Sequence, residues 1–232
     1  EEGIQGETLF DTLVKGDARD AQSCLEMAAE WLARLHNLRL QIAPPETFFS
    51  DEKRRLEHYL SAFYGAHHRH TRRTQEIMDR VLELETSFYG GQPEKLVQGH
   101  GDFHPKNIFV GQESEGPSSR FIAAIDFGSS YTLPPAFDVG TFLAQFRNQF
   151  YGRTEVLGKV SEDLFLRRYM DAAEFLDADF LREVGLFQAR TSLSISYYLI
   201  KVNMGESENL WRVLVEAEHH LSRLLMAPEP AQ

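Results

Sequence analysis

Two polar motifs in the middle of the chain contain the residue types that phosphoryl transfer requires. Residues 96–110 read LVQGHGDFHPKNIFV and residues 121–128 read FIAAIDFG, which sets Asp102, Asn107 and Asp126 in order. Asp102 can take a proton from an attacking hydroxyl, whereas the side-chain oxygens of Asn107 and Asp126 are hard ligands suited to Mg²⁺. Because magnesium neutralises the phosphate charge of a nucleotide, the motifs predict a site for transfer of a phosphoryl group.

The first motif predicts a loop that leads into a strand. Gly101 and Pro105 mark irregular backbone, and the strand-forming residues 108–110 follow Asn107 directly. The carboxamide of Asn107 is therefore expected where the loop enters the strand, on a rigid element.

The second motif predicts the partner strand of a hairpin. Residues 111–119 are rich in glycine, proline, serine and acid, which favours a solvated turn before a strand over residues 121–125. Asp126 then stands at the strand end, beside Gly128, which can take unusual backbone angles. Both candidate metal ligands are expected to converge from these paired strands.

The pattern H-G-D-x-H-P-x-N followed by I-D-F-G resembles the aminoglycoside phosphotransferase and choline kinase family, whose members are related to protein kinases. The resemblance implies a protein-kinase-like fold and the use of ATP with Mg²⁺. It assigns Asp102 as the catalytic base, and Asn107 and Asp126 as the metal ligands.

The match to the protein-kinase pattern H-R-D-L-x-x-x-N is partial. The interval from aspartate to asparagine is kept, but His104 stands where protein kinases carry a lysine. This substitution is usual in the aminoglycoside phosphotransferase branch, and it favours a small-molecule kinase. His100 and His104 are interpreted as supports of the catalytic loop rather than as metal ligands.

A third segment strengthens the resemblance. Residues 134–140, PPAFDVG, resemble the D-P-x-x-D-L-A segment that follows the metal aspartate in this family. The family's equivalent of Asp138 accepts hydrogen bonds from the backbone of the catalytic loop, and buried amides need such an acceptor. Asp138 is therefore expected to support the loop without taking part in the chemistry.

Away from these motifs the chain shows mainly helical periodicity. Apolar residues recur at steps of three and four, as at Leu25, Ala28, Leu32 and Leu35. The predicted helices cover 20–38, a segment starting at 50–52, 74–88, 139–150, 161–176, 180–202 and 207–226. Combined with the resemblance, this predicts an α+β fold that is predominantly α-helical: a protein-kinase-like C-terminal lobe in which a small β-hairpin carries the metal ligands.

Length and composition are consistent with a cytoplasmic lobe. A chain of 232 residues with 42% hydrophobic content can bury a substantial core. No apolar stretch approaches membrane-spanning length, and residues 1–3 lack the features of a secretory signal. Cys24 is the only cysteine, which excludes an intrachain disulfide and suits a reducing compartment. We expect a cytoplasmic protein without a membrane partner.

The charge balance disfavours nucleic acid as a partner. Lysine and arginine number 24 and the acids 35, so the formal charge is −11, and polyanions would be repelled. Such a charge would suit a cationic substrate, although widely spread acids more often serve solubility. The basic segment 67–73 is interpreted as a solvated helix start.

The sequence elements with which the N-terminal lobe of a kinase binds the nucleotide are not found. There is no glycine-rich phosphate loop and no V-A-I-K-like strand with its lysine. Residues 2–9, EGIQGETL, instead resemble the hinge between the two lobes of such kinases. We expect residues 1–14 to form a hinge remnant and a first helix, residues 15–228 the helical catalytic lobe, and residues 229–232 a tail. The expected partner is the N-terminal lobe of the same parent protein, without which we expect weak nucleotide binding and little turnover.

Three functions remain open. The first is transfer of the γ-phosphoryl group of ATP to a hydroxyl of a small, aminoglycoside-like molecule. The second keeps the reaction but takes choline, homoserine, a sugar or a similar metabolite as acceptor. The third is a non-catalytic kinase-like binding module, against which the preserved Asp102, Asn107 and Asp126 argue, because a scaffold has no need of two metal ligands.

The acceptor-binding residues are not assigned by the sequence. The late helices form the acceptor side in the resembling family, so their acids are candidates: Asp171, Glu174, Glu206 and Glu208. Exposed helix charge is the simpler interpretation of these four residues.

Overall fold

The computed structural model describes residues 6–113 and 119–226, most of which are helical. The helices are α1 (Leu9–Lys15), α2 (Ala18–Asn37), α3 (Thr47–Gly65), α4 (Thr71–Tyr89), α5 (Pro135–Gln149), α6 (Thr154–Leu157), α7 (Glu162–Ala172), α8 (Phe180–Lys201) and α9 (Glu208–Met226). The strands are β1 (Gly6–Thr8), β2 (Val97–Gln98), β3 (Ile108–Gln112), β4 (Arg120–Ala124) and β5 (Thr132–Leu133). The predicted α+β class, with helices predominating, is confirmed.

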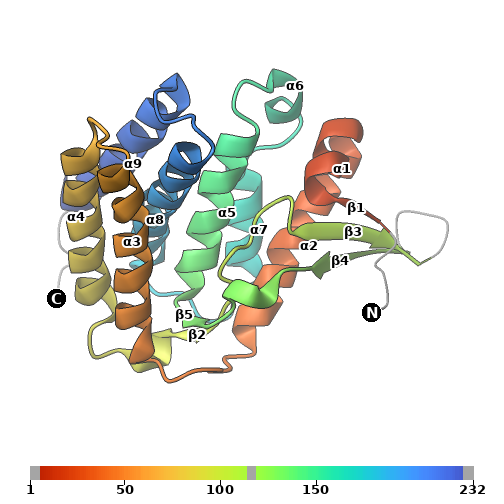
Figure 1. Ribbon diagram of the computed structural model, residues 1–232. Coiled ribbons are helices and arrows are strands. Elements are labelled where there is room, and N and C mark those ends of the chain that lie inside the picture. Colours follow the sequence, from red (N-terminus) through yellow and green to blue (C-terminus); the bar gives the residue numbers. More distant parts are fainter. Residues whose placement is uncertain (1–5, 114–118, 227–232) are drawn as a thin grey trace.

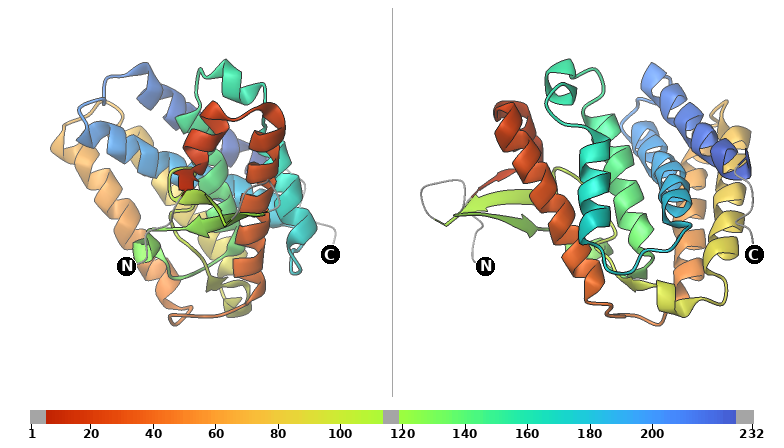
Figure 2. Two further views of the ribbon diagram at one scale, coloured as in Figure 1. Left: turned by 90° about the vertical axis from the view of Figure 1, so that its right-hand side faces the viewer. Right: turned by 180° about the vertical axis from the view of Figure 1, so that it is seen from behind.

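Helices α5 and α8 form the centre of the helical part (Figure 1). Helices α3 and α4 lie on one side of this pair and α2 and α7 on the other, while α9 packs along α8 (Figures 1 and 2). Both central helices bury residues on most of their circumference, as expected for helices surrounded by protein. Gly140 permits their close approach, since a Cβ there would lie 2.6 Å from the Cβ of Phe187 and 2.8 Å from the Val184 carbonyl.

The outer helix α2 shows how the sequence pattern produces this packing. Leu25, Ala28 and Leu32 are fully buried, as their spacing predicts. The helix begins after Asp17, whose side chain accepts a hydrogen bond from the Asp20 backbone N–H at 2.9 Å. The opposite face is charged, so α2 covers the core on one side and meets solvent on the other.

The predicted start of α3 at Ser50 is wrong by one turn. The helix begins at Thr47, because the backbone N–H groups of Thr47 and Phe48 donate to the carbonyls of Pro44 and Pro45 at 3.0 and 3.1 Å. Phe48 is fully buried and anchors this extra turn to the core.

Two other helix boundaries differ from the prediction. Helix α5 begins at Pro135 rather than at residue 139, because proline is favoured at the first helical position, where no backbone N–H is needed. Helix α7 ends at Ala172 rather than at residue 176, since Ala173 turns to extended backbone with ψ of 133°. The remaining predicted helices are confirmed to within a few residues.

A three-stranded antiparallel sheet projects from the helical part, in the order β1-β3-β4 (Figure 1). The predicted hairpin is its core: β3 pairs with β4 from Ile108 opposite Ala124 to Gln112 opposite Arg120. Part of the predicted turn, residues 114–118, lies outside the described residues. A second pair, β2 with β5, places the chain for the loop between β2 and β3.

The opening residues form a strand that the sequence does not predict. Gly6–Thr8 pairs with β3, with Gly6 opposite Gly111, and α1 follows at once. Residues 2–5 of the predicted hinge and the predicted tail, 229–232, lie outside the described residues. Within the described ranges, we find no helix that is both long and apolar enough to cross a membrane.

Candidate active site

The loop between β2 and β3 carries Asp102 and is bent sharply at Gly101. Gly101 has a φ of 82°, and a Cβ at this position would lie 1.9 Å from the carbonyl oxygen of Ser129. Only glycine fits both the left-handed backbone and this close approach. The irregular loop predicted from Gly101 and Pro105 is present, and the loop enters β3 directly after Asn107.

Asp138 holds this loop in place from the first turn of α5. The side chain is fully buried, and its two oxygens accept hydrogen bonds from the backbone N–H groups of His100 and Gly101 at 2.7 and 2.8 Å. Bonds from backbone donors to a carboxylate are among the stronger ones in proteins. These bonds tie the first turn of α5 to the loop that carries Asp102.

Two residues that the sequence does not single out extend this support. His36 Nε2 lies 3.1 Å from Asp138 Oδ2, and His36 Nδ1 lies 2.7 Å from the Tyr169 hydroxyl. With Nε2–H donating to the carboxylate, Nδ1 accepts from the Tyr169 O–H. The signal for His36 in the sequence is a single histidine on the apolar face of α2.

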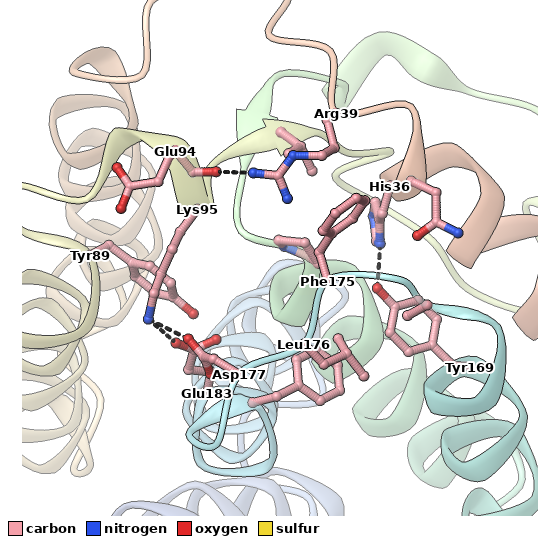
Figure 3. A pocket seen from close by; sticks show the side chains of 15 residues that line it. His36, Arg39, Tyr89, Glu94, Lys95, Tyr169, Phe175, Leu176, Asp177 and Glu183 are labelled. Carbon is pink, nitrogen blue, oxygen red and sulfur yellow. Dashed lines mark hydrogen bonds and ion pairs between the residues drawn. The ribbon is translucent and has the colours of Figure 1, made fainter.

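Tyr169 and His36 also border a cavity of about 310 Å³ (Figure 3). On its opposite side Lys95 reaches Asp177 and Glu183, as Figure 3 shows. None of Asp102, Asn107 and Asp126 lines this cavity.

His100 connects the loop to the end of β4. Its imidazole is buried, with Nδ1 accepting from the Asp102 backbone N–H at 3.3 Å and Nε2 lying 2.9 Å from the Ile125 carbonyl. Since Nδ1 accepts, Nε2 carries the proton and donates. The Ile125 backbone N–H in turn donates to the Asn107 carbonyl at 2.9 Å. These bonds bring the segment of Asp126 alongside Asn107 and Asp102.

The Asp102 carboxylate is partly exposed and is oriented by two neighbours. Asn107 Nδ2 donates to Asp102 Oδ2 at 3.2 Å and to the Asp102 carbonyl at 3.0 Å. His104 Nε2 lies 3.6 Å from the same Oδ2. Burial acts to raise the pKa of Asp102, but His104, the nearby His100 and the Asn107 hydrogen bond outweigh it, so the pKa falls below its usual value. Asp102 is therefore ionised at neutral pH and able to accept a proton.

Asp126 stands in left-handed backbone just after β4. Its φ of 63° and ψ of 56° are angles that aspartate tolerates better than most residues. The sequence prediction gave the unusual backbone to Gly128. The prediction is wrong here, because Asp126 itself makes the turn and Gly128 has no positive φ. This turn leaves the carboxylate of Asp126 exposed beside the loop.

The donors at this place fit a magnesium ion. Asn107 uses its Nδ2 for Asp102, and among the described residues neither its amide oxygen nor the exposed Asp126 carboxylate takes part in a hydrogen bond. One amide oxygen and one carboxylate match the preference of Mg²⁺ for a few protein oxygens, with water and phosphate completing its shell. The described ranges hold no cluster of three or more His, Cys, Asp or Glu side chains arranged for a metal.

A polar cavity of about 290 Å³ opens beside Asp102 on the side of α3 and α8. Its walls come from separate parts of the chain: Arg55, Tyr59, Gly101, Asp102, Ser129, Thr141, Gln145, Arg190, Thr191 and Ser194. The sequence did not identify these residues apart from the loop, because α3, α5 and α8 converge only in the fold. The strongest available signal is Arg190, an arginine in the middle of the long apolar pattern of α8.

The acids proposed from the sequence as acceptor contacts lie elsewhere. None of Asp171, Glu174, Glu206 and Glu208 lines the cavity beside Asp102. Glu206, for example, pairs with Arg69 at 3.3 Å and with His68 at 3.4 Å.

Solved structures of several small-molecule kinases are similar to this fold. An ethanolamine kinase of Plasmodium vivax aligns over 97% of this chain and 64% of its own, with a TM-score of 0.60 and 15% identity. A glucosamine kinase in complex with glucosamine, ADP and inorganic phosphate aligns over 97% and 62%, with a TM-score of 0.54 and 15% identity. The chain thus spans less than two thirds of these structures.

An aminoglycoside 2'-phosphotransferase in a GDP complex aligns over 97% of this chain and 69% of its own, with a TM-score of 0.53 and 19% identity. At these identities the likeness shows the protein-kinase-like fold alone. No curated protein sequence matches the chain. A family model described as "Phosphotransferase enzyme family" matches residues 2–184, which is most of the chain. The chain therefore belongs to the phosphotransferase enzyme family.

Proposed function

We propose that this chain is the catalytic lobe of a kinase that transfers the γ-phosphoryl group of ATP to a hydroxyl of a small molecule. The observation that carries the proposal is the position of Asp102. This ionised carboxylate lines a polar cavity, and it accepts a hydrogen bond from Asn107 Nδ2. An acceptor hydroxyl in the cavity would lie beside Asp102, next to the residue that would help to hold the metal ion.

Asp102 is suited to the role of general base. An acceptor hydroxyl in the cavity would donate its proton to Asp102 as the oxygen attacks phosphorus. Asn107 Nδ2 fixes the orientation of the carboxylate, and the bonds from Asp138 to the backbone of His100 and Gly101 fix the position of the loop. Positioning of this kind accounts for much of the catalysis of phosphoryl transfer, which needs little covalent chemistry from the protein.

Asn107 and Asp126 are the residues that would hold Mg²⁺. The ion, when bound, supplies positive charge that neutralises the phosphates of the nucleotide. His100 ties the chain next to Asp126 to the loop, so the two ligands share one support. We expect the pair to hold the ion loosely in the absence of nucleotide, because two protein groups leave most of its coordination to water.

ATP as the donor and a small-molecule hydroxyl as the acceptor are parts of this proposal. The named glucosamine kinase complex contains ADP, and the chain spans only part of that structure's length. Aminoglycosides, choline, homoserine and sugars are all consistent with transfer to a hydroxyl, and a non-catalytic kinase-like module is the alternative that activity measurements would decide.

The test is acceptor-dependent release of ADP by the full-length protein with magnesium ATP. Asp102→Asn should lower kcat by at least about 100-fold, because a general base contributes roughly 10² to 10⁴ to rate. The fold should survive, since Asp102 is partly exposed and adds little to the core. Asp79→Asn, an exposed change on α4, is the matched control and should leave kcat unchanged. Near-normal turnover of Asp102→Asn would end the assignment of the base.

A further inference from the structure

The cavity beside Asp102 has an unusual charge for an acidic protein. Apart from Asp102, the charged side chains that line it are Arg55 from α3 and Arg190 from α8. The other lining side chains are neutral and able to hydrogen-bond: Tyr59, Ser129, Thr141, Gln145, Thr191 and Ser194. Within residues 6–113 and 119–226, no second carboxylate lines the cavity, although the whole chain has a net charge of −11.

Arg190 is buried and held rigidly. Its Nε and Nη2 donate to the two oxygens of Glu52 at 2.7 and 3.0 Å, and its guanidinium lies 4.6 Å from the centre of the Phe137 ring. Nη1 makes no hydrogen bond within the described ranges, so this end of the guanidinium is available to a ligand. Glu52 is fully buried and does not line the cavity, and it also accepts from the Tyr131 hydroxyl at 2.7 Å.

Arg55 also lines the cavity, and it makes fewer polar contacts within the protein than Arg190 does. Its guanidinium lies 4.1 Å from the centre of the Tyr131 ring, and its nearest acid is Glu52, with Nη1 3.7 Å from Oε1. No hydrogen bond of Arg55 is found among the residues that the structure describes. A third of the side chain is exposed, so its donors are available to a ligand.

The remaining buried acid near this cluster does not cancel the second arginine. Neither carboxylate oxygen of Glu85 has a hydrogen-bond partner in the described part of the chain, and the side chain is fully buried. Burial, and then the Glu52 carboxylate, raise the pKa of Glu85 well above its usual value, which favours the neutral form of this buried group. Apart from the base Asp102, Arg55 and Arg190 are thus opposed only by Glu52, which is paired with Arg190, so the charge of the second guanidinium is left without a paired acid.

We propose that the acceptor carries an anionic group, carboxylate or phosphate, which Arg55 and Arg190 bind while a hydroxyl of the same molecule meets Asp102. The inference rests on the proposed function. Arginine is the residue best suited to such groups, because its planar fork matches their paired oxygens. A cavity of about 290 Å³ is at the small end of ligand pockets, so the acceptor is a compact hydroxylated acid. Polycationic aminoglycosides and choline are disfavoured, since no carboxylate beyond the base would receive them.

The test measures binding rather than turnover, so that it is separate from the test of the kinase reaction. Titration calorimetry of this chain at neutral pH would compare glycerate and gluconate with their neutral counterparts, glycerol and sorbitol, and with choline and kanamycin. Inorganic phosphate would serve as the probe of the anion subsite alone. We expect both acids and phosphate to bind, and to bind at least about tenfold more tightly than the neutral and cationic compounds, as expected for hydrogen bonds to a charged group.

The decisive variant is Arg55→Gln, because Arg55 is partly exposed and its loss leaves the Arg190–Glu52 pair intact. We expect it to weaken binding of the acids about tenfold or more, with no change in the melting temperature beyond a few degrees. Arg54→Gln, on the exposed face of α3 where Arg54 pairs with Asp51, is the matched control and should bind the acids normally. Arg55→Lys should restore part of the affinity.

The outcomes separate the two proposals. Failure of every acid and of phosphate to bind, equal binding of acids and neutral polyols, or equal behaviour of the two glutamine variants would overturn the anionic acceptor. Phosphorylation of a cationic acceptor would do so too, while leaving the kinase reaction established. Arginine-dependent binding of acids that the full-length protein never phosphorylates would support the anion site and count against the kinase reaction.

Discussion

Asp138→Asn should lower the stability of the protein by about 3 kcal/mol, because an amide cannot accept both of the backbone hydrogen bonds that the carboxylate accepts. The native side chain accepts from the backbone N–H groups of His100 and Gly101 with its two oxygens. Asparagine has the same shape but one acceptor, so it keeps one of these bonds and turns an NH₂ group towards the other donor.

The magnitude follows from the burial of the site. A hydrogen bond to a charged group contributes about 1.5–3 kcal/mol, and a buried N–H left without a partner costs about 1–3 kcal/mol. Asp138 is fully buried, so water cannot replace the lost acceptor. Allowing for partial relaxation of the loop, the loss of unfolding free energy should be about 2–5 kcal/mol.

Urea denaturation followed by circular dichroism would measure this change, with the m value checked for constancy. Asp171→Asn, at an exposed position of α7, is the matched control and should change stability by less than about 0.5 kcal/mol. In the full-length protein, kcat should fall under conditions where the variant is folded, because the loop that positions Asp102 is loosened. A variant as stable as the wild type would refute the supporting role of Asp138.

Two further predictions concern proton affinity and helix packing. Because the pKa of Asp102 is lowered in the folded protein, the acid limb of kcat/KM that reports Asp102 in the full-length enzyme should lie below the ordinary pKa of an aspartate. His104→Gln should raise that pKa and move the acid limb to higher pH, and an unmoved limb would contradict the contact. Gly140→Ala should destabilise the chain by about 1–3 kcal/mol in urea through overpacking. Gly185→Ala, with only one contact at 3.8 Å, should instead stabilise it by up to about 1 kcal/mol, and equal effects of the two changes would contradict the close approach of α5 and α8.

The sequence predicted the helices and the hairpin because their signals are local. The spacing of Leu25, Ala28 and Leu32 records the buried face of α2 whatever the helix packs against. Strand β1 has no such signal: Gly6–Thr8 is too short for a pattern and becomes a strand only because β3 lies beside it. A segment of three residues contains no local signal for pairing with a strand about a hundred residues away.

The unusual backbone at Asp126 was assigned to the wrong residue for a related reason. Glycine is the safest guess for left-handed backbone, since it has no Cβ. Here the bond from His100 to the Ile125 carbonyl and the bond from the Ile125 N–H to the Asn107 carbonyl fix the chain immediately before the turn. Aspartate tolerates these angles, so the metal ligand itself takes the turn that the tertiary contacts impose.

The chemistry and the acceptor differ in how far the sequence reveals them. Asp102, Asn107 and Asp126 lie within one short stretch, so their order and spacing can be read directly. Arg55 and Arg190 are far apart in the chain, and each looks like an ordinary helical arginine until α3 and α8 are packed together.

The net charge of the chain does not predict the charge of the side chains that line the cavity. A total of −11 suggests a cationic substrate, yet most of the acids are on the outside of the helices or are paired. Inside the cluster, Glu52 is paired with Arg190 and Tyr131, and burial raises the pKa of Glu85, so the charged side chains that line the cavity are arginines apart from Asp102. Because charge in a cavity is decided by burial and pairing rather than by the sum over the chain, the acceptor of such a kinase has to be inferred from the residues that the fold brings together.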